Sequence, residues 1–158
     1  MRKPPAAPAV PAPGRGKRGV EGHLGYLLRQ ASGAFRGAME RALAELDVTP
    51  PQFVVLTMIE AYPGLSNADL ARLSYLTPQT VSLIVSNLKR SGAVTSRPHA
   101  VHGRIRQLEV SKSGREILAR CKRRVHDSER QLAVGLSAQE EVVVRRWLTR
   151  VAVDNARS

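Results

Sequence analysis

Apolar residues recur at steps of three and four along most of this chain, which is the spacing of amphipathic α-helices. They predict a long first helix over residues 20–46. A second helix is expected to begin after Thr49, because its hydroxyl can cap the helix, Pro50 suits the first helical position, and Gln52 stands where a capping box needs it. The first third of the chain is therefore expected to be two helices.

The middle of the first helix has unusually small side chains, over residues 31–34 and again at Gly37 and Ala38. A glycine inside a helix costs about 1 kcal/mol relative to alanine. Two explanations remain open, which are close approach of another helix at a dimer interface and room for a ligand.

The centre of the chain has the pattern of a helix-turn-helix. Ser66, with Asp69 three residues later, predicts the start of a short helix, and Thr77 followed by Pro78 predicts the start of the next. Gly92 supplies a left-handed end for that second helix. Two strands over residues 94–97 and 104–110 should follow, since apolar and polar residues alternate there, with a loop over 98–103.

Two more helices are expected in the last third of the chain. Ser111 begins a long one, Gly135 interrupts it, and a capping box of Ser137 and Glu140 begins the last. Apolar residues spread widely around both, so we expect them to bury surface against another subunit. The predicted fold class is mainly α with a small β-wing, a winged helix-turn-helix with six helices.

Charge changes this picture from a helical domain to a nucleic-acid-binding one. The chain has 13 acidic residues and a net charge of +12, yet none of the acids lies between Leu70 and Leu108. The basic and imidazole side chains of that run are Arg72, Lys89, Arg90, Arg97, His99, His102, Arg104 and Arg106. An acid-free basic run over a helix-turn-helix is typical of a DNA-binding surface, whereas a merely solvated face usually mixes both signs of charge.

The second helix of this pair is the expected reading element. At about 100° per residue, its apolar residues fall on one side and its short polar residues on the other. Such a helix fits a major groove, where Gln79 can pair with adenine and Leu83 can contact a thymine methyl group. The residues expected to bind DNA are Ser66, Thr77, Gln79, Thr80, Ser82, Leu83, Ser86, Lys89, Arg90, Arg97, His102, Arg104 and Arg106.

Residues 1–19 differ in composition from the rest. They hold five of the ten prolines, five basic residues and no acid. Such a segment cannot bury enough apolar surface to fold, so a disordered arm is expected. The arm either contacts DNA phosphates or a minor groove, or is a solvated tail without a specific role.

The remaining chemistry argues against an enzyme. The lone Cys121 falls on the inner side of its helix, where a buried structural thiol is expected rather than a redox sensor, and no disulfide can form within the chain. His99 and His102 lack the further ligands of a zinc site. No phosphate-binding loop or catalytic arrangement is evident, and no apolar run is long enough to span a membrane. We therefore expect a cytoplasmic protein without cofactor, metal or membrane partner.

The motifs together resemble the MarR (multiple antibiotic resistance regulator) family. The matching positions are residues 46–53 (LDVTPPQF), 70–71 (LA), 77–82 (TPQTVS), 88, 92 and 110–114 (VSKSG). The resemblance implies a homodimer in which residues 20–48 and 112–155 form the dimerisation region and 49–111 the winged helix-turn-helix lobe. It also implies a repressor that binds pseudo-palindromic double-stranded DNA, with Arg104 as the wing arginine, and leaves it when a small molecule binds.

The same resemblance implies a class of effector. Family members commonly sense aromatic carboxylates and some sense their CoA thioesters, and the basic surplus of this chain favours an anion. The candidate ligand-binding residues on the first helix are His23, Tyr26, Gln30, Arg36 and Met39. Ordinary surface or core positions are the alternative for each.

Three positions depart from the family pattern. His102 stands where the wing usually has an acidic residue, Leu83 where relatives are often basic, and Ser86 where they are often acidic. The operator sequence of a relative therefore does not carry over. Two other functions stay open, which are an architectural protein that coats DNA without sequence preference and a winged-helix module that binds another protein.

His102 generates the first prediction, that the wing is pH-sensitive. An imidazole with a reference pKa near ~6.5 in a phosphate-facing loop gains a positive charge as pH falls, so operator affinity should rise from pH 8 to pH 6. Fluorescence anisotropy of labelled operator checks this. Equal affinities of wild type and His102→Ala across that range would contradict it.

Overall fold

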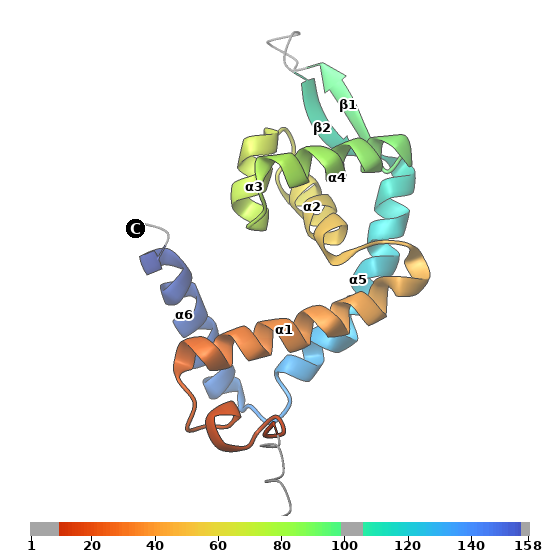
Figure 1. The fold of residues 1–158 in the computed structure, drawn as a ribbon. Helices are drawn as coiled ribbons and strands as arrows, with labels where there is room; N and C mark the ends of the chain where they lie inside the picture. The colour runs from red at the N-terminus through yellow and green to blue at the C-terminus, as the bar shows by residue number, and fades with distance from the viewer. Residues whose placement is uncertain (1–9, 99–105, 156–158) are drawn as a thin grey trace, which may run out of the picture. The chain divides into compact units, whose positions relative to one another are not determined.

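The computed structural model describes residues 10–98 and 106–155 (Figure 1). Its contacts divide the chain into two units, Met1–Ala38 and Met39–Ser158. Within the described residues there are six α-helices and one two-stranded antiparallel sheet, which confirms the predicted fold class.

The first helix, α1, is shorter than the sequence predicted. It spans Leu24–Leu43, and its final turn continues as a 3-10 helix, η2, over Ala44–Leu46. Asp47 ends this turn with φ 53°, a left-handed backbone. The helix begins four residues later than expected because residues 19–22 form turns and a bend.

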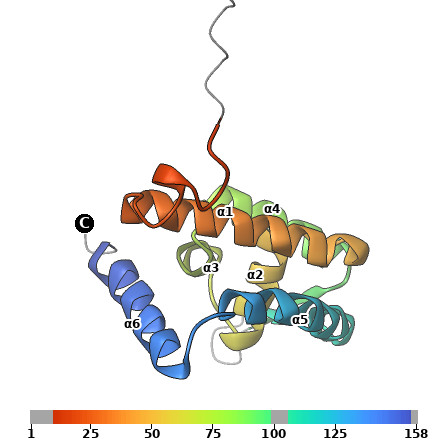
Figure 2. The same ribbon diagram turned by 90° about the horizontal axis from the view of Figure 1, so that it is seen from below.

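Part of the expected disordered arm has a defined conformation. A short 3-10 helix, η1, spans Gly16–Arg18, and Figures 1 and 2 show this segment turned back beside the first turns of α1. The Arg18 guanidinium holds it there, since Nε donates to Gln30 Oε1 at 3.0 Å and Nη1 donates to the Pro11 carbonyl at 2.7 Å. Disorder of the arm as a whole stays a prediction, since residues 1–9 lie outside the described part of the chain.

The capping residues place the next helices as predicted. Helix α2 spans Pro50–Ala61, and both bonds of the Thr49–Gln52 capping box are present. Helix α3 spans Asn67–Ser74 after its cap Ser66, and helix α4 spans Pro78–Arg90 after its cap Thr77. Gly92 follows with φ 76°, which confirms the left-handed stop.

The wing is the hairpin of β1, Val94–Pro98, and β2, Arg106–Val110. Its register pairs Val94 with Val110 and Thr95 with Glu109. The first strand runs one residue farther than predicted, since Pro98 was expected in the loop, and the described part of the second agrees with the prediction. Residues 99–105 lie outside the described part of the chain.

The two helices in the last third of the chain also begin directly after their predicted capping residues. Helix α5 spans Lys112–Leu132, and helix α6 spans Ala138–Asn155. Gly135 separates them with φ 88°, and the Ser137 N–H donates to Glu140 Oε2 at 2.8 Å in the predicted capping box.

One apolar core joins α2, α3, α4, the wing and α5. Its fully buried members include Leu56, Leu70, Val81 and Leu118, one from each of these helices. Val94 and Val110 add the base of the wing to it. Two ion pairs tie the surface of α5 to the elements before it, Lys122 to Glu60 on α2 and Arg124 to Glu45 on η2.

The start of α5 is bound closely to the turn that follows α4. The hydroxyls of Ser111 and Ser113 donate to the Gly92 carbonyl at 2.6 Å and 3.1 Å, and the Ser111 N–H donates to the Ala93 carbonyl at 3.0 Å. Gly114 sits so close that a Cβ there would lie 2.0 Å from the Ala93 carbonyl oxygen. Only glycine fits this joint between α4, β1 and α5.

This contact predicts that Gly114→Ala destabilises the protein by about 1–3 kcal/mol, since a rigid backbone carbonyl must shift to admit the methyl group. Urea unfolding measures the change. Gly33→Ala on α1 is the control, because no atom lies within 4 Å of the position that its methyl group would take and alanine favours a helix more than glycine does. Equal stability of Gly114→Ala and wild type would refute the close approach.

Candidate nucleic-acid interface

Helix α4 shows its polar edge to solvent and its apolar edge to the core. Val81, Ile84, Val85 and Leu88 are buried, at 0–7% exposed. We call the opposite side the outer face of α4; its exposed residues are Gln79, Ser82, Leu83, Ser86, Lys89 and Arg90. Leu83, at 64% exposed, is the one apolar side chain among these exposed residues. This is the arrangement that a groove-reading helix needs.

The first turn of α4 is rigidly capped. Thr77 Oγ1 accepts a hydrogen bond from the Thr80 N–H at 3.1 Å, and the two hydroxyls lie 2.8 Å apart. Both side chains are exposed, so they can also reach phosphate oxygens. The helix N-terminus adds its partial positive charge at this point, which favours an anion.

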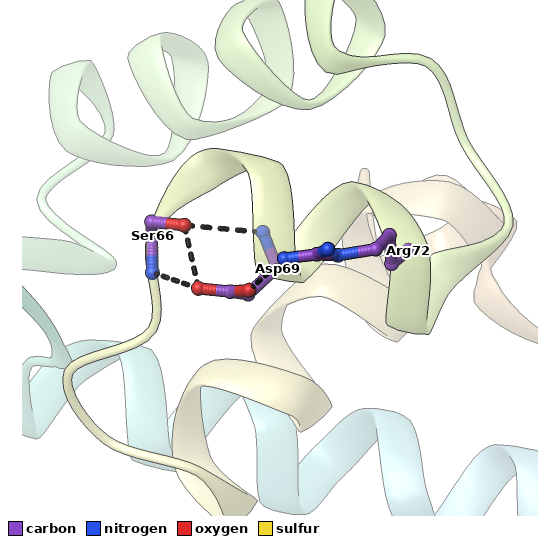
Figure 3. A network of polar contacts seen from close by, with 3 residues as sticks. All are labelled: Ser66, Asp69 and Arg72. Carbon is purple, nitrogen blue, oxygen red and sulfur yellow. Dashed lines mark hydrogen bonds and ion pairs between the residues drawn. The ribbon is translucent and has the colours of Figure 1, made fainter.

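The predicted contact residue Ser66 belongs to a polar network at the start of α3 (Figure 3). Its hydroxyl donates to Asp69 Oδ2 at 2.6 Å and accepts from the Asp69 N–H at 3.2 Å. Arg72 forms an ion pair with the other oxygen of the same carboxylate. Ser66 therefore holds the helix start, and the Asp69 carboxylate offsets part of the Arg72 charge.

Asn67 makes a contact with the outer face of α4 that the sequence did not indicate. Its Nδ2 donates to Ser82 Oγ at 3.3 Å, which links the start of α3 to the outer face of α4. The bond fixes the acceptor side of the Ser82 hydroxyl and leaves its proton for a base or phosphate. The residues are 15 positions apart, and no local pattern signals such a contact.

The wing carries an internal ion pair that the sequence did not predict. Arg97 Nε lies 3.0 Å from Glu109 Oε2 across the hairpin. An exposed pair of this kind is weak, so Arg97 can exchange the carboxylate for a phosphate. Arg106 lies at the start of β2, whereas His99, His102 and Arg104 fall outside the described residues.

Two of the predicted ligand-binding residues line one pocket within the unit Met1–Ala38. The pocket has a volume of about 620 Å³ and is lined by Pro13, Arg18, Tyr26, Leu27, Arg29, Gln30, Ala31, Gly33 and Ala34. Tyr26 and Gln30 are thus brought together, while His23, Arg36 and Met39 do not line it. Met39 is instead buried, at 8% exposed. The small residues of α1 form part of the pocket wall.

The other candidate chemistry has structural explanations. Cys121 is fully buried, as expected, and burial raises the pKa of its thiol. Among the described residues no three His, Cys, Asp or Glu side chains gather to hold a metal ion. No single described helix is long and apolar enough to cross a membrane; only Leu24–Leu46 and Pro50–Ala61, taken together as a bent pair, reach that length and composition, and core helices do so too.

Comparisons with known proteins point to one family. The sequence model of the MarR family matches residues 46–105, which include α2, α3, α4 and β1. The chain is 31% identical over 131 residues to the HTH-type transcriptional repressor Rv2887 of Mycobacterium tuberculosis, covering 83% of this chain and 94% of that protein.

Solved structures of the same relative have a similar fold. A complex of Rv2887 with salicylic acid has a TM-score of 0.67 at 33% identity and covers 82% of this chain and 96% of that one. A complex of Rv2887 with DNA has a TM-score of 0.65 at 30% identity and covers 82% and 97% of the two chains.

The Ser66–Asp69–Arg72 network predicts a pH-dependent stability. Hydrogen bonds from the Ser66 hydroxyl, then from Arg72 and the Ser66 N–H, lower the pKa of the Asp69 carboxyl from its ordinary value of 3.8. The ionised cap therefore contributes fully above that value, and the contribution is lost as pH falls through the lowered pKa. Wild type should be more stable than Asp69→Asn at pH 7, and the difference should shrink toward pH 3.

Urea unfolding of both proteins from pH 7 to pH 3 measures this difference. Asp127→Asn is the control, because Asp127 also pairs with an arginine three residues away but does not cap a helix. A gap between wild type and Asp69→Asn that stays constant with pH would contradict the prediction.

Proposed function

The chain belongs to the MarR family, and from that premise we propose that it is a homodimeric, sequence-specific repressor, released from a pseudo-palindromic operator by a small anionic ligand. The relatives that it resembles are transcriptional repressors, so the protein is a regulator and not an enzyme. Because it belongs to this family of regulators, we also propose that the protein binds its operator in the cytoplasm.

The observation that carries the proposal is the outer face of α4. It combines Gln79 and the short serines with an exposed Leu83, and no acidic residue stands on the helix. Amide and hydroxyl groups read base edges, and an exposed leucine suits a thymine methyl group. The DNA complex of a relative that is 30% identical to this chain supports the same use of the fold.

A homodimer is supported by apolar side chains that the described subunit leaves in solvent around the end of α5 and along α6. They are 38–69% exposed and comprise Leu132, Val134, Leu136, Val142, Val143, Val144, Leu148 and Val153. So much exposed aliphatic surface in one region is typical of an interface. Two-fold symmetry would then present two α4 helices to half-sites about one DNA turn, ~34 Å, apart.

The proposed effector is an aromatic carboxylate, with its CoA thioester as the second choice. The pocket beside α1 offers the Tyr26 ring for stacking and two guanidinium groups, Arg18 and Arg29, for an anion. Arg18 uses Nε and one Nη1 bond internally, which leaves donors for a ligand. The salicylic acid complex of a relative supports this ligand class.

The high positive charge also suits a second candidate function, that of an architectural protein that coats DNA without sequence preference. Footprinting of the intergenic DNA beside its own gene separates the two functions. A repressor protects one or two palindromic sites, whereas a coating protein protects all sequences with an affinity that falls steeply with salt. A winged-helix module that binds only another protein would protect none.

The reading surface predicts two different mutational effects. Gln79→Ala should weaken operator binding by about 1–3 kcal/mol and relax specificity at one base pair, because a base contact is lost. Arg104→Ala should weaken binding to all sequences about equally and lower the salt dependence, because a phosphate contact is lost.

Anisotropy titrations on operator and scrambled DNA at several salt concentrations measure both effects. Gln131→Ala, an exposed glutamine on α5, is the control and should bind as wild type does. Wild-type binding by both Gln79→Ala and Arg104→Ala would show that the reading surface lies elsewhere.

The pocket predicts that salicylate binds and that Arg18 contributes. Arg18→Ala should bind salicylate at least tenfold more weakly, because it removes a charge-assisted hydrogen bond worth roughly 1.5–3 kcal/mol. Isothermal titration gives the affinities. Arg15→Ala is the matched control, since Arg15 lies on the same segment outside the pocket. Equal affinities of the two variants would exclude this site.

A further inference from the structure

Tyr75, in the turn of the helix-turn-helix, has a backbone conformation that does not suit a tyrosine. Its φ is 52°, in the left-handed region, and the structure has only one other non-glycine residue there among those described, Asp47. The Leu76 N–H bonds to the Ala71 carbonyl at 3.0 Å and the Tyr75 N–H to the Arg72 carbonyl at 3.4 Å. This is the closing motif of a helix, whose left-handed position normally holds glycine.

The folded subunit does not compensate this strain by burying the side chain. Tyr75 is 84% exposed, so its ring gains little from packing against the rest of the subunit. The neighbouring Leu76, by contrast, packs against the core. A large aromatic residue kept in a strained and exposed position points to a role outside the fold of the subunit itself.

The position of Tyr75 fits a contact with the DNA backbone. It precedes Thr77, the cap of α4, by two residues, and it lies in the run from Leu70 to Leu108 that contains no acid. When the first turn of a reading helix enters the major groove, the turn before it stands at the groove edge, where a phosphate strand runs. Tyrosine hydroxyls are among the groups that bind phosphate oxygens.

We propose that Tyr75 is a DNA-binding residue whose hydroxyl donates a hydrogen bond to a backbone phosphate beside the major groove. The inference rests on the proposed function, because it requires that α4 enters that groove. The contact positions the helix and carries no sequence information. Because the phenol is neutral, it also releases no counterion, unlike the arginines of the wing.

Two substitutions separate the side chain from the strain. Tyr75→Gly removes both, so its melting temperature should equal that of wild type or exceed it by about 2 °C, while operator affinity should fall about fivefold or more. Tyr75→Phe keeps the ring and the backbone strain and removes only the hydroxyl. It should lose most of the same affinity without a gain in stability.

The left-handed Asp47 supplies a matched control. It lies by the other end of α4, in a hollow of about 510 Å³ shared with Arg90 and Ser91. Asp47→Gly relieves the same kind of strain and removes a negative charge, which can only favour DNA. It should therefore bind operator at least as tightly as wild type. Weaker operator binding by Asp47→Gly would show that a glycine at a left-handed position weakens binding through added backbone flexibility alone. The loss in Tyr75→Gly would then have the same cause, and the proposal would be overturned.

The experiment combines thermal unfolding at one protein concentration with anisotropy on operator and on scrambled DNA over several salt concentrations. The proposal expects equal fold-losses on both DNAs for Tyr75→Phe and an unchanged salt slope. Wild-type affinity of Tyr75→Phe would overturn it, with the proposed function intact if Gln79→Ala still weakens operator binding. If wild type itself bound no DNA, the proposed function would fail, and this inference with it.

Discussion

Burial of the apolar side of α4 is the constraint on which the interface depends. Val81 is fully buried and Ile84, Val85 and Leu88 nearly so, against a core supplied by α2, α3, the wing and α5. Because a helix turns by about 100° per residue, fixing these four side chains also fixes the direction of Gln79, Ser82 and Ser86. The polar face is therefore oriented by residues that never meet DNA.

The core sets the orientation of the helices, and hydrogen bonds at the helix ends determine where each helix begins. Thr49, Ser66 and Thr77 each accept the N–H three residues on, so α2, α3 and α4 all begin at defined positions. The Asn67–Ser82 bond then joins the two helices of the DNA-binding motif directly. The first turn of α4 is consequently rigid before any ligand arrives, which reduces the entropy lost on binding.

The sequence predicted the parts of this structure that depend on local chemistry. Capping residues located α2 to α6, and periodicity identified the buried side of α4. The sequence did not reveal contacts between side chains that are far apart along the chain. The Arg18–Gln30 bond and the Arg97–Glu109 pair each join side chains 12 residues apart along the chain, and no local pattern signals either contact. Likewise, nothing in the local pattern around Ser74 shows that Tyr75 occupies the left-handed position.

The joint at Gly114 has a mechanical consequence. Three hydrogen bonds and a backbone contact too close for any Cβ leave no slack between the start of α5 and the segment from Gly92 to Ala93. Helix α5 is 21 residues long, and these contacts hold its first turn against that segment. A tilt of the first turn of α5 would therefore also move the segment from Gly92 to Ala93, which connects the C-terminal end of α4 to the first strand of the hairpin.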